Sequence, residues 1–224
     1  MEHTYTAIDD ELAALARDLG VMGDLAVQQV RDAVEAFAGH DVDAAARIAA
    51  ADAQLDELDA GIEQQAIRFI ALRQPMADDL RRPISAMKSS AQLERCGDLA
   101  KNIAKRVGRM EGQASSSQIT AISDLGRLVT GRLADVVAAY KTDDAAAAHA
   151  VWATDTQIDE QHEAVVREIV VCMGSDPTSI GVCTHLLFIA KNLERIGDHA
   201  TNIAELVYYQ VTGLTLGDRP KLPG

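Results

Sequence analysis

Two pairs of carboxylates recur in the chain with the spacing of one helical turn. Glu94 and Asp98 lie in the stretch LERCGDLAKNIAKRV, and Glu194 and Asp198 lie in LERIGDHATNIAELV. Ten of the fifteen positions match, and each match is 100 residues from its partner. Residues four apart share a helix face, where two like charges repel by about 0.2–0.5 kcal/mol. The repeated pairs therefore indicate that a cation or a partner offsets this repulsion.

A second set of acids repeats at a slightly different distance. The stretch DAQLDE carries Asp52 and Asp56, and DTQIDE, 103 residues later, carries Asp155 and Asp159. An α-helix rises about 1.5 Å per residue. Counted from the connector between the two adjacent antiparallel helices of each half, these aspartates lie at about the same height as the Glu–Asp pair of that half. Clusters of oxygen ligands hold Mg²⁺, Mn²⁺, iron or Zn²⁺. The sequence thus predicts four carboxylates at one level in each half, outside the apolar core.

Ordinary salt bridges are the alternative interpretation of these acids. The first half offers Arg95, Lys101 and Lys105 as partners, whereas the second half offers Lys191 and Arg195. Position 201 is a threonine and position 205 a glutamate, so the second half has fewer cations near its motif. The salt-bridge interpretation is therefore weaker there, and both interpretations stay open.

Glycines and asparagines near the acidic pairs also repeat in both halves, whereas the histidines do not. Gly97 and Gly197 each cost about 1 kcal/mol in a helix interior relative to alanine, so their recurrence indicates close approach of another backbone. Asn102 and Asn202 recur one turn after the aspartates. The histidines do not repeat, and His162, three residues after Asp159, is the best ligand candidate among the six.

Composition excludes several classes of function. The 224 residues carry a net charge of −13, which disfavours binding to nucleic acid or anionic lipid through a basic patch. No apolar run reaches the roughly 18 residues that a membrane span needs, and the N-terminus does not resemble a signal peptide. The three cysteines, Cys96, Cys172 and Cys183, show no paired spacing and are interpreted as reduced thiols in a cytosolic chain. No nucleotide-binding loop, zinc-protease motif or nucleophile pair is present, so an enzyme is not expected.

Helical periodicity runs through almost the whole chain, with few aromatic residues (4%) and 48% hydrophobic residues. Further alignment of VRDAVEAFAGHD from Val30 with LADVVAAYKTDD from Leu133 extends the repeat at an offset of 103. We expect an all-α protein of two tandem three-helix units, residues 1–112 and 113–224. The six expected helices cover residues 6–38, 42–72, 78–110, 119–141, 144–173 and 177–212.

The repeated motif resembles that of a known family. LERCGDLAKNIA and LERIGDHATNIA, together with RQPMADDLR from Arg73, are similar to the signature of the PhoU family of phosphate-signalling regulators. The resemblance covers about residues 5–212. It implies two PhoU-type three-helix bundles in pseudo-two-fold symmetry, and surface clusters of iron, zinc or a related metal. By position, the ligands would be Glu94, Asp98, Glu194 and Asp198 with Asp52, Asp56, Asp155 and Asp159. Asn102, Asn202, Arg95, Arg195, Gly97 and Gly197 would support them.

The same resemblance implies a role in signalling. Such proteins are cytosolic and non-enzymatic, and they are expected to form homodimers. At the inner face of the membrane they link the phosphate transporter, through its ATPase subunit, to a sensor histidine kinase. They repress the starvation response when phosphate is plentiful. Two alternatives remain from the residues alone: a helical adaptor that needs no metal, and a di-iron carboxylate enzyme. The latter normally requires inward-facing E-x-x-H motifs, which the sequence lacks.

Overall fold

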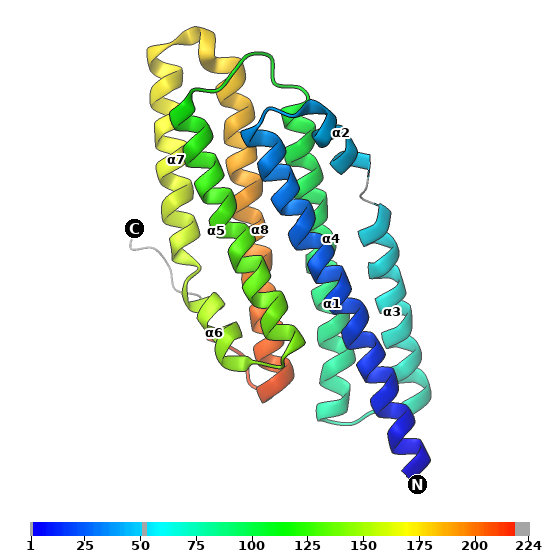
Figure 1. Ribbon diagram of the computed structural model, residues 1–224. Coiled ribbons are helices and arrows are strands. Elements are labelled where there is room, and N and C mark those ends of the chain that lie inside the picture. Colours follow the sequence, from blue (N-terminus) through cyan, green and yellow to red (C-terminus); the bar gives the residue numbers. More distant parts are fainter. Residues whose placement is uncertain (1, 51–52, 218–224) are drawn as a thin grey trace.

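The computed structural model describes residues 2–50 and 53–217, and it is helical almost throughout (Figure 1). Within these ranges it has six long helices and two short ones. They are α1 (Glu2–Ala38), α2 (Val42–Ala50), α3 (Ala53–Arg73), α4 (Asp78–Val107), α5 (Ser116–Lys141), α6 (Ala145–Ala153), α7 (Thr156–Ser175) and α8 (Ile180–Thr212), with a 3₁₀ turn at Pro177–Ser179. The expected all-α class is confirmed.

Two of the predicted helices are described in two parts each. The helix predicted over residues 42–72 is described as α2 and α3, on either side of residues 51–52, which lie outside the described ranges; residues 144–173 form α6 and α7 rather than one helix. In the second case the break falls at Thr154, whose hydroxyl donates to the carbonyl oxygens of Ala150 and Val151 at 3.0 and 3.1 Å. A threonine hydroxyl that bonds the preceding turn weakens helix propagation, and Asp155 follows directly. The single helix predicted over residues 144–173 was therefore wrong, because local side-chain bonding divides it.

The connector between the halves keeps its predicted length of eight residues but lies three residues earlier in the chain, since α4 ends at Val107 rather than at residue 110. α5 begins at Ser116, three residues before the predicted start, because Ser115 and Gln118 form a capping box. The Ser115 hydroxyl accepts from the Gln118 amide nitrogen at 3.3 Å, and the Gln118 side chain accepts from the Ser115 amide nitrogen at 3.0 Å. This reciprocal bonding satisfies amide groups at the helix start.

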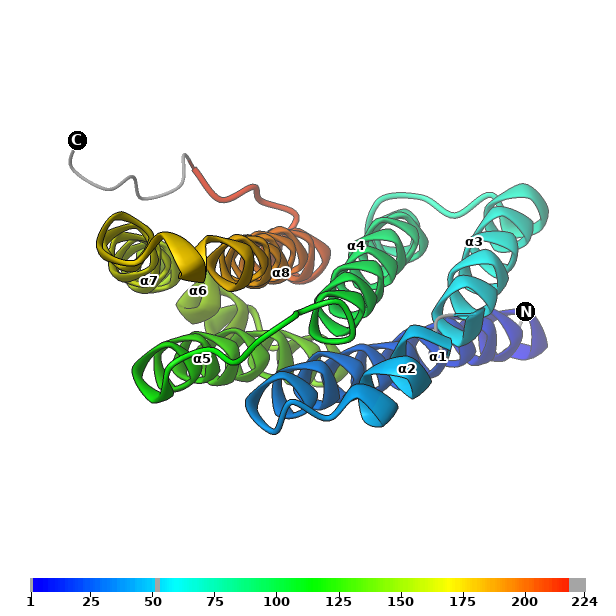
Figure 2. The same cartoon turned by 90° about the horizontal axis from the view of Figure 1, so that it is seen from above.

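The long helices form two bundles that lie side by side. α1, α3 and α4 make the first bundle, and α5, α7 and α8 make the second, with α1 beside α5 and α4 beside α8 (Figure 2). The short helices α2 and α6 lie at opposite ends of the molecule (Figure 1). This arrangement is the pseudo-two-fold pair of units that the repeat predicted.

Glycines allow the bundles to approach closely where α1 crosses α5. A Cβ atom on Gly23 would lie 2.7 Å from Val137, and a Cβ atom on Gly126 would lie 2.6 Å from Val34. These four residues are related by the 103-residue offset, so each half contributes one glycine and one valine. The contact between the bundles is therefore nearly symmetric at this crossing.

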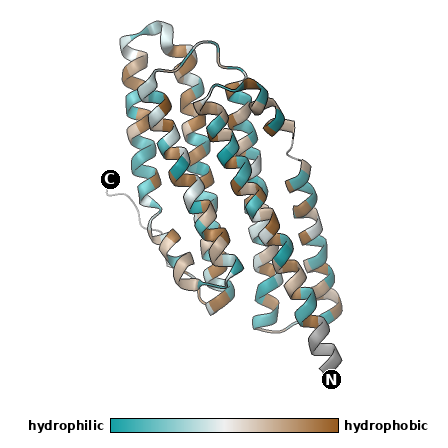
Figure 3. Ribbon diagram, in the orientation of Figure 1, coloured by the Kyte–Doolittle hydropathy of each residue, from teal (hydrophilic) through white to brown (hydrophobic). Residues whose placement is uncertain are grey.

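The core consists of small and branched apolar side chains from all the long helices. Cys96 and Cys183 are buried in it, Cys172 is partly buried, and all three are free thiols. Polar and apolar positions alternate along each helix (Figure 3), as amphipathic helices of a bundle require. Among the described residues, no helix has the length and apolar character needed to cross a membrane.

Candidate metal-binding acidic sites

The first acidic site consists of Asp56 and Asp59 on α3 and Glu94 and Asp98 on α4. Burial raises the pKa of Glu94 above its ordinary value, and the nearby carboxylates of Asp98, Asp56 and Asp59 raise it further, while Arg95 opposes them. Three acids from two helices therefore surround Glu94, whose side chain is only 20% exposed.

Two cations offset part of the negative charge of the first acidic site, and a hydroxyl donates a hydrogen bond to it. Arg95 lies 3.4 Å from Glu94 and 3.6 Å from Asp98, and Lys101 lies 3.6 Å from Asp98. The Ser90 hydroxyl donates to Asp59 at 2.6 Å. The salt-bridge interpretation is thus supported in this half. Asp52, the remaining predicted ligand, lies outside the described residues.

The second acidic site consists of Asp155, just before α7, Asp159 and His162 on α7, and Glu194 on α8. Asp198, the remaining predicted ligand, follows Glu194 by four residues on α8. Burial raises the pKa of Asp159, and Asp155 and Glu194 raise it further. Burial also lowers the pKa of His162, which favours the neutral imidazole that binds metals. This site therefore contains a possible nitrogen ligand that the first site lacks.

Fewer cations balance the second acidic site. Lys191 donates to Glu194 Oε1 at 2.7 Å, but Oε2 of Glu194 is buried without a hydrogen-bond partner in the part of the chain that the structure describes. Asp155 is 9% exposed and accepts from the Thr201 hydroxyl at 2.7 Å. Removing one partner from a buried carboxylate costs about 1.5–3 kcal/mol, so Thr201 fixes Asp155 in place.

The two repeated glycines lie beside these acidic sites. A Cβ atom on Gly97 would overlap the Leu55 side chain of α3, and one on Gly197 would lie 2.7 Å from Ile158 of α7. The close approach that the sequence predicted is therefore present. It is made by an apolar side chain rather than by another backbone, and it holds each pair of acidic helices together.

The predicted supporting residues have different environments. Asn102 is exposed, as are Arg95 and Arg195. Asn202 instead lies between the bundles, where its amide donates to Gln92 Oε1 on α4 at 3.0 Å, and His199 Nδ1 lies 2.8 Å from the same oxygen. The asparagine has therefore different surroundings in the two halves.

Sequence reasoning missed Gln92, Ser90 and Thr201. Only Thr201 carried a signal, because it replaces Lys101 of the first half at a position beside the motif. The other two occupy ordinary helical positions, and their partners come from distant parts of the chain.

Donor chemistry at the acidic sites suits a divalent cation, since carboxylate oxygens and an imidazole are available and one oxygen of Glu194 is buried without a partner. Over residues 8–50 and 53–217, however, no three His, Cys, Asp or Glu side chains converge closely enough to hold an ion in the observed rotamers. The metal sites therefore stay a prediction.

Comparison with known proteins agrees with the repeat. The PhoU domain model matches residues 19–107 and again residues 122–207. The chain is 49% identical over 223 residues to the phosphate-specific transport system accessory protein PhoU homolog of Caulobacter vibrioides, covering 99% of this chain and 97% of that protein. It is 42% identical over 221 residues to the homolog of Rhizobium meliloti, covering 98% and 93%.

Solved structures give the same result. PhoU from Pseudomonas aeruginosa superimposes with a TM-score of 0.89 at 35% identity, over 92% of this chain and 99% of that one. The phosphate transport system regulatory protein PhoU from Streptococcus pneumoniae gives 0.87 at 32% identity, over 94% and 99%. The chain belongs to the PhoU family.

Proposed function

We propose that this protein regulates phosphate uptake as an accessory protein of a phosphate-specific transport system. The observation that carries the proposal is the similarity to proteins of that name over 99% of the chain, with both domain matches present. The relatives are named as accessory proteins rather than enzymes, so the di-iron enzyme alternative is not retained.

The regulator would act by binding two partners, the ATPase subunit of the transporter and a phosphate-sensing histidine kinase. It would work in the cytoplasm or at the inner face of the membrane, and it would form a homodimer. Each chain would consist of two domains that meet near residue 112. Long packed helices with charged outer faces support this role, because a rigid surface can hold two partners at a fixed separation. When phosphate is plentiful, the bound protein would keep the kinase from activating its response regulator.

Affinity purification from phosphate-replete cells tests the partners. The tagged chain should retain the transporter ATPase and the kinase, and deletion of its gene should switch on the starvation response despite abundant phosphate. Absence of both proteins from the purified material, with an unchanged response in the deletion strain, would contradict the proposal. Size-exclusion chromatography with light scattering tests the homodimer.

We also propose that the acidic sites bind a divalent metal such as iron or zinc. Glu194, Asp159 and His162 would be ligands in the second site with Asp155 and Asp198 beside them, and Glu94, Asp98, Asp56 and Asp52 would act in the first. A bound divalent cation would offset part of the negative charge of the crowded carboxylates. Crowding of acids around Glu94 and Asp159 supports this proposal.

Metal analysis of the purified protein tests this second proposal. The double variant Glu194→Ala with Asp198→Ala should lose about half of the bound metal, because one of the two sites is removed. The double variant Glu160→Ala with Glu168→Ala removes the same charge from exposed positions of α7 and should retain all of it. Equal metal content in all three proteins would exclude the second acidic site.

A metal-independent adaptor remains the second candidate function. It is favoured by the absence, among the described residues, of a ready group of three ligands. Chelation followed by the affinity purification separates the two candidates: retained partners support the adaptor, and lost partners that return with added metal support the metal-dependent regulator.

A further inference from the structure

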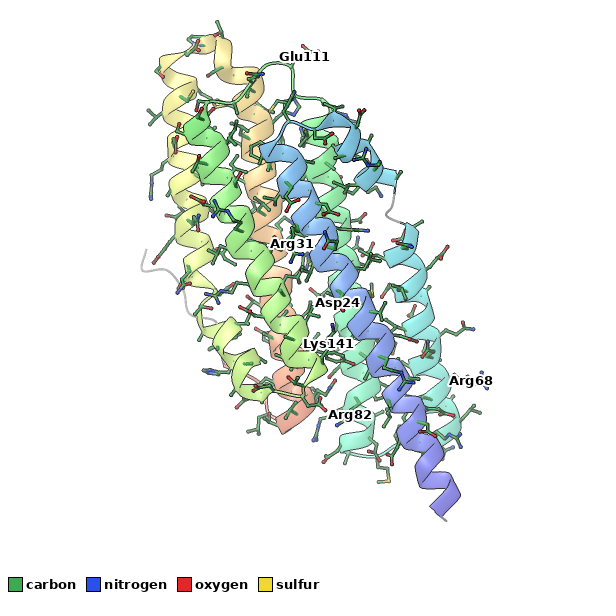
Figure 4. All side chains as sticks on the ribbon, in the orientation of Figure 1. Asp24, Arg31, Arg68, Arg82, Glu111 and Lys141 are labelled. Carbon is green, nitrogen blue, oxygen red and sulfur yellow. The ribbon has the colours of Figure 1, made fainter. Side chains whose placement is uncertain are left out.

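A pocket lined by both apolar and charged residues lies where the two bundles meet at one end of the molecule. It has a volume of about 390 Å³ and is lined by residues of α1, the start of α4, the end of α5 and the end of α8. We call it the interbundle pocket and define it by Arg17, Asp24, Arg82, Tyr140, Lys141, Asp143 and Gln210. Figure 4 labels Asp24, Arg82 and Lys141 along this junction. It is separate from both acidic sites, since none of their residues line it.

Two ion pairs organise the lining charges. Lys141 Nζ lies 2.6 Å from both carboxylate oxygens of Asp24, so it joins α5 to α1. Arg82 Nη2 lies 3.1 Å from Asp143 Oδ2. Because Asp143 comes two residues after the end of α5, this pair joins α4 to the C-terminal end of α5. Gly20 permits the first pair, since a Cβ atom there would lie 3.1 Å from the Lys141 side chain.

Unused hydrogen-bond donors remain after these pairs are made. A guanidinium has five N–H donors, and only the Nη2 group of Arg82 is engaged with Asp143. The side chain of Arg17 is exposed on α1 and makes no hydrogen bond or ion pair with another described residue. With three cations and two carboxylates, the lining has a local excess of one positive charge. At physiological ionic strength the Debye length is about 8 Å, so the distant acids of this chain oppose an anion here only weakly.

One buried acceptor is also unused. Gln210 is 8% exposed, and its amide nitrogen donates to Asp143 Oδ1 at 2.9 Å. Its carbonyl oxygen Oε1 is buried without a partner among the described residues. Such an oxygen is costly to leave unsatisfied, and it needs a hydrogen-bond donor, either water or a protonated ligand that replaces the water. Burial raises the pKa of the neighbouring Tyr140 hydroxyl, so that group also stays protonated and able to donate.

We propose that the interbundle pocket binds a protonated oxyanion, namely hydrogen phosphate, between the bundles. The guanidinium groups of Arg17 and Arg82 would donate to its oxygens, a geometry in which arginine binds phosphate with paired hydrogen bonds. The P–O–H group would donate to Gln210 Oε1. Sulfate has the same shape but carries no proton at neutral pH, so it would leave the Gln210 oxygen unsatisfied.

This proposal does not depend on the partners or metals proposed above, because it concerns a different part of the molecule. Binding would add contacts between α1 and α4 of one bundle and α8 of the other. The bundles would then be held together more firmly when phosphate is abundant.

Isothermal titration calorimetry of the full chain with phosphate and with sulfate, at equal ionic strength, tests the proposal. Phosphate should bind saturably, and at least about tenfold more tightly than sulfate, the factor expected for one satisfied buried hydrogen bond. The variants Arg17→Gln and Arg82→Gln should each weaken phosphate binding about tenfold. The control Arg68→Gln removes the same charge from an exposed position on α3 and should bind as the unmodified protein does.

A third variant tests whether Gln210 is the reason that phosphate, which carries a proton, binds more tightly than sulfate. Gln210→Met removes the acceptor, and the equivalent residue of the first half is already Met110, so a thioether is compatible with this position of the fold. This variant should bind phosphate and sulfate alike. No saturable phosphate binding up to about 10 mM would overturn the proposal, since weaker binding would supply less than about 3 kcal/mol. Equal effects of Arg68→Gln and the two pocket variants would overturn it as well.

Discussion

The two ends of the contact between the bundles are related by pseudo-symmetry but differ in chemistry. Five charged residues line the interbundle pocket, whereas its counterpart is a cavity of about 160 Å³ without any Lys, Arg, Asp or Glu among the described residues that line it. The counterparts are Phe37 for Tyr140, Ala38 for Lys141, His40 for Asp143 and Met110 for Gln210. A cavity is therefore present at both ends of this junction, and among the described lining residues substitution placed Lys, Arg and Asp only at the end that forms the interbundle pocket.

The same contrast separates the two acidic sites. In the first, Arg95 and Lys101 lie near the carboxylates, while in the second Thr201 replaces the lysine and His162 replaces an aspartate. The apolar contacts that hold the helices together are alike in both halves. Packing is thus the symmetric part of this molecule, and polar chemistry is the part in which its halves differ.

The largest expected effect tests the symmetric part. Gly23→Leu and Gly126→Leu should each destabilise the protein by about 3 kcal/mol, because the added side chain would overlap Val137 or Val34 in a closely packed crossing. Urea unfolding measures the change. Gly61→Leu is the control: a Cβ atom at this position would have no neighbour within 4 Å, so the variant should be neutral or stabilised by up to about 1 kcal/mol. A large difference between the first two costs would show that the crossing is not energetically symmetric.

A smaller effect should separate the two acidic sites. Thr201→Val should cost about 1.5 kcal/mol, because Asp155 loses a hydrogen bond in a buried place. Lys101→Met, at the equivalent position, should cost no more than about 0.5 kcal/mol, because Lys101 is partly exposed and its ion pair is screened. Thermal unfolding at neutral pH gives both values. Equal costs would mean that the sites are anchored in the same way.

The smallest effect concerns charge repulsion in the second acidic site. Asp159→Asn should stabilise the metal-free protein by about 0.5 kcal/mol at pH 7, the size of a like-charge repulsion on helices. The pKa of Asp159 is raised in the folded state, mainly by burial. The folded protein therefore holds the proton more tightly than the unfolded chain, and its stability falls as pH rises from the unfolded value through the raised one.

Denaturant unfolding between pH 4 and pH 7 measures this dependence. The benefit of Asp159→Asn should be complete at neutral pH and shrink as the solution is acidified, because the native aspartate then becomes protonated. A benefit that stays constant with pH would show that the carboxylate charge is not its cause. Added divalent metal should reverse the order of stability if the second acidic site binds it.

Much of the fold could be predicted because the signals are local or repeated. The repeat at 100 and 103 residues indicated two equivalent units, and amphipathic periodicity gave the long helices. Gly97 and Gly197 indicated close contacts at the correct places. The break between α6 and α7 was missed because periodicity continues across it, while the hydroxyl bonds of Thr154 depend on rotamers that a pattern does not show.

By itself, the sequence determined the helical class, the duplication and the carboxylates on the flanks, since each follows from the spacing of neighbouring residues along one helix. Only the tertiary structure decided that Asp155 is held by Thr201, that Gln92 joins the bundles, and that Arg17, Arg82 and Gln210 line one pocket. Those contacts join helices separated by tens of residues in the chain. Their geometry depends on how the helices pack, and no spacing within a single helix encodes it.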